Sequence, residues 1–243
     1  MRLHGKIRSV ASLSDCEQAR MLDLMTAHYD NICSKKFRTD LTEKHGAVIL
    51  TDASGAIQGF TTFLTLHIDF QDNRVSALYS GDTIIARHCW GQLELFRVYG
   101  ELFSKLLQQF PTPMYWFLLT KGIKTYGLLP LFFQNFYPSY ATPTPAYEQQ
   151  LLDSLAMHKF SDYYVKSQGI VRLIPRADRL KPELADIPGH KRGKRHIQFF
   201  LERNPGYVNG DELVCLARIS AANFTPIAHR FVNGFEPHTT VYG

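Results

Sequence analysis

Apolar side chains recur at helical spacing in two stretches of the chain. From Trp90 to Phe110 they stand three and four residues apart, with polar residues such as Glu94 and Lys105 off that face. This spacing predicts an amphipathic helix. A second helix is predicted to run to about Tyr29, because Ser14-Asp15 supplies N-cap chemistry ahead of an apolar pattern.

Shorter runs have the composition of strands. They are rich in β-branched and aromatic residues and are separated by turn clusters such as Asp52-Ala-Ser-Gly55. The fourth is interrupted at Ser80-Gly81-Asp82, which predicts a β-bulge or break. The fifth is continuously apolar, as in a strand buried on both faces. The runs are Lys6–Val10, Ala47–Thr51, Ala56–Ile68, Arg74–Ile85 and Met114–Leu119.

The order of these elements predicts an α/β (α+β) fold. Strand, helix, three antiparallel strands, helix and buried strand give a mixed, mostly antiparallel sheet with one parallel crossover and flanking helices. A further helix is expected from about Thr125 to Phe136, ending at Pro138. Residues 1–138 are predicted to form the core, and residues 139–243 a C-terminal extension that packs on it and has a strand at Glu212–Arg218.

Composition indicates where the protein works and what kind of partner it has. The chain has 243 residues, 45% of them hydrophobic, and its apolar runs are far shorter than the roughly 20 residues of a membrane helix. Neither a secretion signal nor a pair of cysteines at CxxC spacing is present, so we expect a cytoplasmic protein with reduced thiols and no metal. The net charge of +5 suits an anionic partner. The basic residues are dispersed apart from His190–His196, so nucleic acid is not the expected partner.

The element order resembles that of the GNAT acyltransferase superfamily, mainly over residues 1–138. The blocks Ser80–Gln92 and Tyr115–Gly122 are similar to those of divergent GNAT-like proteins, including maturases that fatty-acylate ribosomal peptides. The resemblance implies that the strand before the long helix diverges from the next strand, so that a pantetheine arm enters between them. It implies an acyl-CoA or acyl carrier protein thioester as donor and an amine as acceptor.

In that superfamily a glycine-rich loop ahead of the long helix binds the donor's pyrophosphate with backbone amides. The equivalent stretch here is Arg87-His88-Cys89-Trp90-Gly91-Gln92, which keeps one arginine and one glycine but lacks the second small residue. The resemblance therefore suggests that Arg87, His88, Gly91 and Gln92 bind the donor. Lys121, which follows the buried strand, could meet a phosphate.

Acyl transfer to an amine needs a proton acceptor, donors for the tetrahedral oxyanion and a proton for the leaving thiolate. Asp82 is the candidate to accept the amine proton or to hold the acceptor's ammonium group, although Gly81-Asp82 is also ordinary turn chemistry. A bulge at Gly81 would turn nearby amides toward the donor carbonyl.

Two further catalytic candidates have equally simple structural interpretations. His67 stands two residues before Asp69, hence on one strand face, and could act as a base; both could also be polar strand-end residues. The superfamily's general-acid tyrosine position holds Phe132 or Phe133, so Tyr126 is the candidate to protonate the thiolate. Tyr126 and Lys121 could also be exposed residues at a helix start.

The sequence thus predicts an N-acyltransferase that uses direct attack. The apolar stretch Leu128–Phe133 suits a medium or long acyl chain, although core packing would explain the same residues. An acidic carrier protein could dock on His190–His196, unless that stretch is a solvated helix face. Two alternatives stay open: a non-catalytic acyl-CoA-binding domain, and an acyl-enzyme formed on Cys89.

Overall fold

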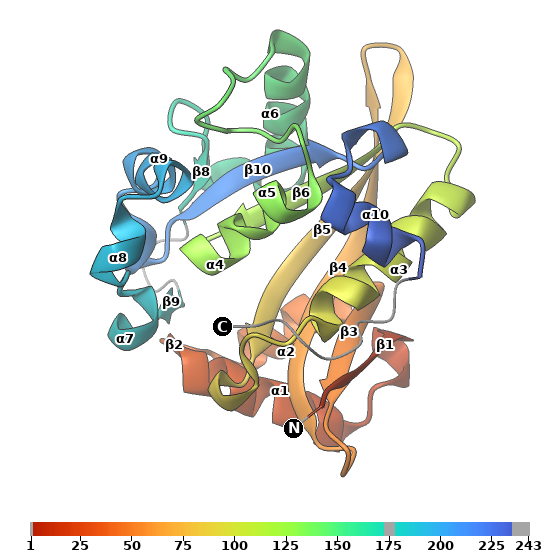
Figure 1. The fold of residues 1–243 in the computed structure, drawn as a ribbon, viewed down its shortest axis with the longest axis vertical. Coiled ribbons are helices and arrows are strands. Elements are labelled where there is room, and N and C mark those ends of the chain that lie inside the picture. The colour runs from red at the N-terminus through yellow and green to blue at the C-terminus, as the bar shows by residue number, and fades with distance from the viewer. Residues whose placement is uncertain (1, 173–177, 235–243) are drawn as a thin grey trace.

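The computed structural model describes residues 2–172 and 178–234. Its centre is an eight-stranded sheet in which every neighbouring pair is antiparallel except β5 and β6 (Figure 1). In spatial order the strands are β1 (His4–Ser9), β3 (Gly46–Thr51), β4 (Ile57–Phe70), β5 (Asn73–Ile85), β6 (Met114–Thr120), β10 (Glu212–Arg218), β8 (Ile170–Val171) and β7 (Tyr164–Val165). The predicted mixed, mostly antiparallel sheet with flanking helices is confirmed.

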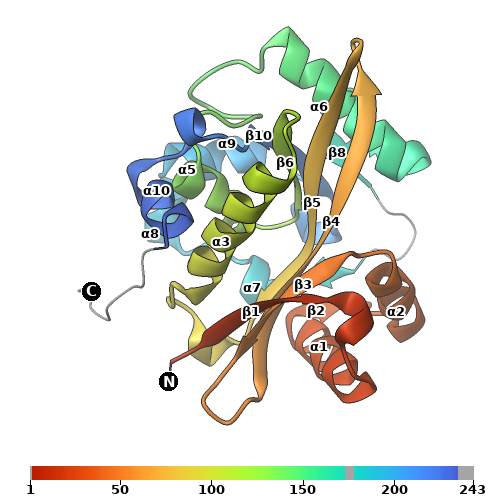
Figure 2. The same cartoon turned by 90° about the vertical axis from the view of Figure 1, so that its right-hand side faces the viewer.

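Helices cover both faces of this sheet. Figure 2 shows α1 (Asp15–His28), α2 (Ser34–Thr42) and α6 (Ala146–Phe160) on one side of β4 and β5. On the other side lie α3 (Glu94–Gln109), α5 (Leu128–Phe132) and α10 (Pro226–Val232). The remaining helices are α4 (Ile123–Tyr126), α7 (Pro182–Ala185), α8 (Gly189–Arg192) and α9 (Arg195–Arg203). Below, the two sides are called the α2 face and the α3 face.

Local sequence explains the two long N-terminal helices. Ser14 Oγ accepts from the Glu17 amide, and Glu17 accepts in return from the Ser14 amide, so α1 begins with a capping box. In α3 the apolar stripe is buried, and Tyr99 packs with its ring centroid 5.1 Å from that of Trp116 on β6. This helix carries the chain from β5 to the parallel strand β6, as the sequence predicted.

The predicted helix from Thr125 to Phe136 is wrong as a single element. It consists of the two short helices α4 and α5, and the chain then turns extended. Phe133 and Tyr137 form isolated bridges with Phe224 and Leu216, so pairing with the C-terminal half replaces helical hydrogen bonds. Helix α2 was not predicted, because Phe37 and Leu41 are its only buried residues and leave a weak apolar pattern.

The region predicted as an extension shares the sheet with the core. Strand β10 pairs with β6 from Leu213 opposite Thr120 to Arg218 opposite Tyr115. A separate two-stranded sheet joins β2 (Tyr29–Asp30) to β9 (Arg179–Leu180). This small sheet brings the segment 178–185 back beside the end of α1.

Two features of β5 determine where the site lies. Between the pairs Thr61–Thr83 and Phe63–Ser80, strand β4 has one residue and β5 has two, Gly81 and Asp82, so β5 is bulged there. The parallel pairing of β5 with β6 ends at Ser80 opposite Leu118, while β5 continues to Ile85. The two parallel strands therefore separate at the bulge.

Two adjacent threonines on β4, Thr61 and Thr62, test how much side-chain hydrogen bonds contribute to stability. Thr61 Oγ1 lies 2.8 Å from Thr83 Oγ1 and 3.1 Å from the Tyr99 hydroxyl, whereas the buried Thr62 hydroxyl has no hydrogen-bond partner. We expect Thr61→Val to lower the free energy of unfolding by about 1–2 kcal/mol, because it leaves bonded groups unsatisfied. Thr62→Val, the matched control, should be neutral or stabilising. Urea denaturation measures both, and equal losses would contradict this account.

Candidate functional site

A pocket of about 770 Å³ opens where β5 and β6 separate. This is the carboxyl end of a parallel strand pair, a place where α/β sheets commonly bind ligands. The volume falls within the usual range of small-molecule sites. Since its walls include residues from both faces of the sheet, the pocket passes through the gap between the two strands.

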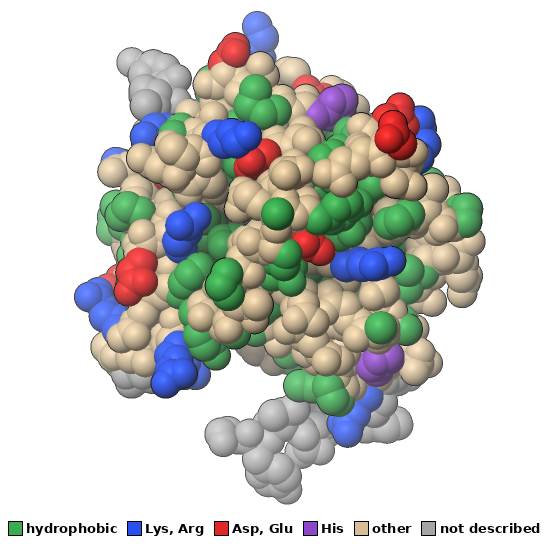
Figure 3. Space-filling model, turned by 90° about the horizontal axis from the view of Figure 1, so that it is seen from above, with side chains coloured by type: hydrophobic (Ala, Val, Ile, Leu, Met, Phe, Trp, Pro, Cys, Tyr) green, Lys and Arg blue, Asp and Glu red, His purple; other side chains and the backbone are tan. Residues whose placement is uncertain are grey.

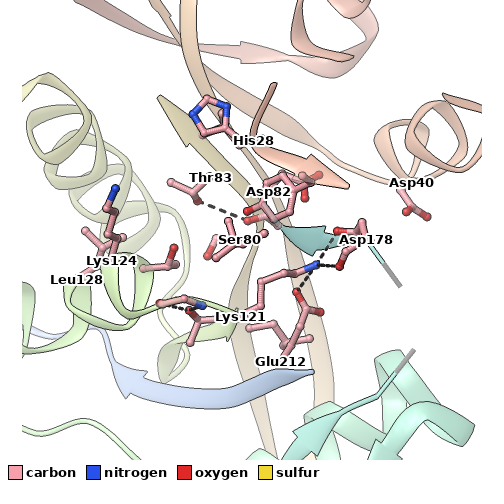
Figure 4. Close-up of a pocket in the computed structure, with 18 of the residues that line it drawn as sticks. His28, Asp40, Ser80, Asp82, Thr83, Lys121, Lys124, Leu128, Asp178 and Glu212 are labelled. Carbon is pink, nitrogen blue, oxygen red and sulfur yellow. Dashed lines mark hydrogen bonds and ion pairs between the residues drawn. The ribbon is translucent and has the colours of Figure 1, made fainter. Parts of the chain in front are cut away.

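The two ends of the pocket differ in chemistry. On the α3 face the walls are mainly apolar; this apolar side comprises Trp90, Leu95, Phe96, Ile123 and Leu128. On the α2 face they are mainly charged; this charged side comprises Lys36, Asp40, Glu43, Lys44 and Lys159. Ser80, Gly81, Asp82 and Thr83 of β5 lie between the two sides. Figure 4 shows Lys124 and Leu128 on one side of β5, and Asp40 and Asp178 on the other.

A buried ion cluster forms one wall. Lys121 Nζ lies 2.6 Å from Asp178 Oδ2 and 3.3 Å from Glu212 Oε1, and Figure 4 shows it pointing at both carboxylates. Burial by itself lowers the pKa of Lys121, but Glu212 and Asp178 outweigh it and raise that pKa. Lys36 also lies 3.8 Å from Asp178. The cluster therefore ties the end of β6 to β10 and to the segment that enters β9.

Asp82 lies at the bulge and lines the pocket. Burial is the main cause that raises its pKa to about 6, with a smaller contribution from the negative charge of Asp178. Lys121 and Lys44 oppose that shift. Near neutral pH the carboxyl group is therefore largely ionised, and its pKa suits a group that gains and loses a proton.

The four loop residues predicted to bind the donor, Arg87, His88, Gly91 and Gln92, do not line the pocket, although Trp90 of the same loop does. Arg87 pairs with Glu183 at 3.1 Å, and His88 is exposed. Gly91 has a φ of +88°, and no atom lies within 4 Å of where a Cβ on it would stand. The side-chain oxygen of Gln92 accepts from the Leu3 amide at 2.9 Å, which fixes this loop to β1. Their predicted contact with the donor stays a prediction.

The first turn of α3 also differs from a simple phosphate-binding terminus. It carries Glu94, whose Oε1 accepts from the Gly5 amide and pairs with Arg97 at 2.8 Å. A carboxylate there already interacts with the positive end of the helix dipole. An incoming pyrophosphate would meet that negative charge.

The structure does not bring His67 or Tyr126 to the pocket. His67 Nδ1 lies 2.9 Å from Ser76 Oγ, and its neighbour Asp69 is exposed beside Arg74. Tyr126 is fully buried, and its hydroxyl donates to the Pro138 carbonyl at 3.0 Å. Burial raises the pKa of Tyr126. Where these side chains lie gives no support to the predicted base and acid roles.

Cys89 has the environment of a core residue. It is 1% exposed, and burial raises the pKa of its thiol, whereas a nucleophilic cysteine needs a lowered pKa and access to substrate. Of the apolar stretch 128–133, Leu128 lines the pocket, but Leu129, Phe132 and Phe133 pack in the core. Core packing therefore explains most of that stretch.

Acidic and basic side chains are intermixed, both in the pocket walls and on the surface. Five lysines and five carboxylates line the pocket, so its walls are balanced despite the net charge of +5. The face seen in Figure 3 shows acidic and basic side chains scattered among the others. In the basic stretch, Arg192 lies 3.3 Å from Asp186, and the side chains of His190 and Lys191 lie outside the described residues.

The described part of the chain holds neither a metal-binding cluster nor a membrane-spanning helix. Residues 2–172 and 178–234 contain no group of three or more histidine, cysteine, aspartate or glutamate side chains placed to hold a metal ion. In the same ranges no helix has the length and apolar character needed to cross a membrane.

Comparisons with known proteins give weak structural likenesses. No family model and no curated protein matches the sequence. A conserved protein of Enterococcus faecalis V583, described as a probable N-acyltransferase, is 12% identical with a TM-score of 0.43 over 54% of this chain and 33% of that one. The GNAT family N-acetyltransferase YhbS of Escherichia coli, solved with CoA, is 16% identical with a TM-score of 0.38 over 53% and 68%.

A third solved structure is the ribosomal-protein-S18-alanine N-acetyltransferase of Escherichia coli. It is 13% identical with a TM-score of 0.39 over 56% of this chain and 83% of that one. The chain thus spans about a third of the first protein and larger parts of the other two. Likenesses with TM-scores below 0.5 carry no conclusion about the activity of this chain.

The raised pKa of Asp82 predicts a pH-dependent stability. Its folded pKa of about 6 lies above the unfolded value of about 3.9, so the folded state binds the proton more tightly. This contribution is fully present below about pH 4 and is lost as pH rises through 6. Asp82→Asn should therefore remove a decline in the free energy of unfolding over that range.

Urea titrations from pH 4 to pH 8 measure that difference. Asp69→Asn is the matched control, because Asp69 is an exposed aspartate on the neighbouring strand. It should leave the decline unchanged. A decline of the same size in Asp82→Asn and wild type would show that Asp82 is not its source.

Proposed function

We propose that this chain is an N-acyltransferase that transfers an acyl group from a CoA or carrier-protein thioester to an amine by direct attack. The observation that carries the proposal is the pocket that passes through the sheet at the bulge, with Asp82 inside it. A thioester and an amine could approach from opposite faces and meet there. The resemblance of the sequence to GNAT acyltransferases points to the same reaction.

The donor is proposed to enter from the apolar side. Past Ser80 the facing backbone groups of β5 and β6 are not paired with each other, so a pantetheine arm could hydrogen-bond between the strands. The acyl chain would then lie against Leu95, Phe96 and Leu128. These walls suit a medium or long chain, because each methylene group of the chain that they bury contributes about 0.8 kcal/mol to binding.

The amine is proposed to enter from the charged side. Its lone pair attacks the thioester carbon, and the carbonyl π electrons move to oxygen to form a tetrahedral oxyanion. Asp82 takes the proton that the attacking nitrogen releases. The oxyanion then collapses, the carbon–sulfur bond breaks and the thiolate leaves. It takes up the proton that Asp82 accepted, so Asp82 returns to its ionised form and no acyl group becomes attached to the protein. A bulge amide is the candidate oxyanion donor.

Thiol release tests the reaction. A series of donors from acetyl-CoA to palmitoyl-CoA, mixed with pooled amines, should release free thiol only when an acceptor is present. Asp82→Asn should lower kcat about 10²- to 10⁴-fold, the usual effect of losing a general base. In wild type, kcat at saturating acceptor should rise with pH through about 6, as Asp82 ionises.

Three variants serve as controls. His67→Gln and Tyr126→Phe should keep wild-type kcat, because neither side chain lines the pocket. Cys89→Ala should do the same. Tight donor binding without thiol release would favour the non-catalytic acyl-binding domain, and an acyl group found on Cys89 by intact mass would favour the acyl-enzyme.

Chain-length preference tests the donor side. Leu128 begins α5 and lines the apolar side. Leu128→Trp adds volume there, so the preferred acyl chain should become shorter while kcat with the preferred donor stays within a few-fold of wild type. Leu129→Met is the control, because Leu129 is buried in the core and does not line the pocket. An unchanged preference in Leu128→Trp would place the acyl chain elsewhere.

A further inference from the structure

We infer that Lys44 is a catalytic residue whose ammonium group binds the thioester carbonyl oxygen and stabilises the oxyanion that forms on it. The inference rests on the proposed function, since it assigns a role within that reaction. Lys44 follows the C-terminus of α2 and lines the charged side of the pocket.

The position of Lys44 relative to the bulge is the first support. Its Cε lies 3.1 Å from where a Cβ on Gly81 would stand, so the lysine passes directly over the bulged residue. Because Gly81 has no side chain, it leaves the room that this approach needs. A Cβ there would also lie 2.5 Å from Thr62 Oγ1. The end of the Lys44 side chain and the bulged residue therefore lie side by side in the wall of the pocket.

The second support is that Lys44, unlike three other lysines of the pocket, forms no ion pair with a carboxylate of the described residues. Lys36, Lys121 and Lys159 each pair with a carboxylate. In contrast, within residues 2–172 and 178–234 no carboxylate oxygen lies within 4.0 Å of Lys44 Nζ. A half-buried cation in a pocket without such a partner is suited to a negative charge that appears there during the reaction.

The remaining contacts of Lys44 leave N–H donors of its ammonium group available to a ligand. Nζ donates to the Asp40 carbonyl at 3.1 Å and lies 5.5 Å from the centroid of the Tyr79 ring. An ammonium has three N–H donors, so two are left for a ligand. Burial lowers the pKa of Lys44, and the charge of Asp82 opposes that shift. Reduced hydration of this kind strengthens the attraction to an oxyanion.

Lys44 also has a purely structural interpretation. A lysine at a helix C-terminus commonly donates to the last carbonyls, as Lys44 does to Asp40. Lys44→Gln separates the two roles, because glutamine can still donate a hydrogen bond but has no charge. Lys44→Arg keeps the charge. The matched control is Lys35→Gln, which removes an exposed charge from α2, the helix that Lys44 follows.

The first experiment measures the carbonyl itself. A donor labelled with ¹³C at the thioester carbonyl is bound without acceptor, and its infrared stretch is compared with that of the free donor. An ammonium on the oxygen polarises the bond and should shift the band to lower frequency in wild type and Lys44→Arg. The shift should be largely lost in Lys44→Gln and kept in Lys35→Gln. Equal shifts in wild type and Lys44→Gln would overturn the inference.

The second experiment measures turnover. Lys44→Gln should lower kcat about 10²-fold, the usual effect of removing one oxyanion donor, with little change in the acceptor KM. A raised acceptor KM with unchanged kcat would instead make Lys44 an acceptor-binding residue and overturn the inference, as would an unchanged kcat.

The two experiments distinguish failure of the inference from failure of the proposed function. A wild-type chain that shifts the carbonyl band but releases no thiol with any amine would contradict transferase activity and leave the role of Lys44 in binding the carbonyl intact. A wild-type chain that binds no thioester would overturn both.

Discussion

The separation of β5 from β6 is the constraint on which the site depends. Two parallel strands that pair from Ser76 to Ser80 stop pairing where β5 gains an extra residue against β4. Backbone groups that would complete a sheet are left facing a gap, and a buried unpaired amide or carbonyl is costly. The gap therefore needs a ligand, water or polar side chains, and the fold supplies Asp82 and Lys44 at its rim and an ion cluster in its wall.

Much of the sheet could be predicted from the sequence because local pattern and tertiary packing agree there. The capping box at Ser14, the apolar face of α3 and the continuous apolar strand β6 each point to one structure. The bulge was predictable from Ser80-Gly81-Asp82, where small and turn-forming residues interrupt a strand. Phe133 and Tyr137 misled the prediction, because their pairing with Phe224 and Leu216, 91 and 79 positions later, overrides the helical pattern.

The site was harder to predict than the fold. Asp82 and Lys121 line the pocket, but the partners that set their chemistry are distant in sequence. Glu212 could have been noticed as a charge at the start of an apolar strand, whereas Asp178 and Lys44 have no local signal. Lys44 follows a helix whose weak pattern was missed, and Asp178 is placed through the pairing of β9 with β2. His67 was chosen for its spacing from Asp69 and Tyr126 for its place after the buried strand, and neither pattern reveals where a side chain points.

The position of β10 has a consequence for how the chain is made. Strand β6 leaves the ribosome roughly ninety residues before the strand that covers its open edge, and its apolar side chains and unpaired backbone must wait for that partner. Exposed edges of this kind invite association with other chains. Because β10 also brings Glu212 to Lys121, the buried lysine gains this counter-charge only when the late strand docks. Completion of the pocket wall and protection of the nascent sheet are thus a single event.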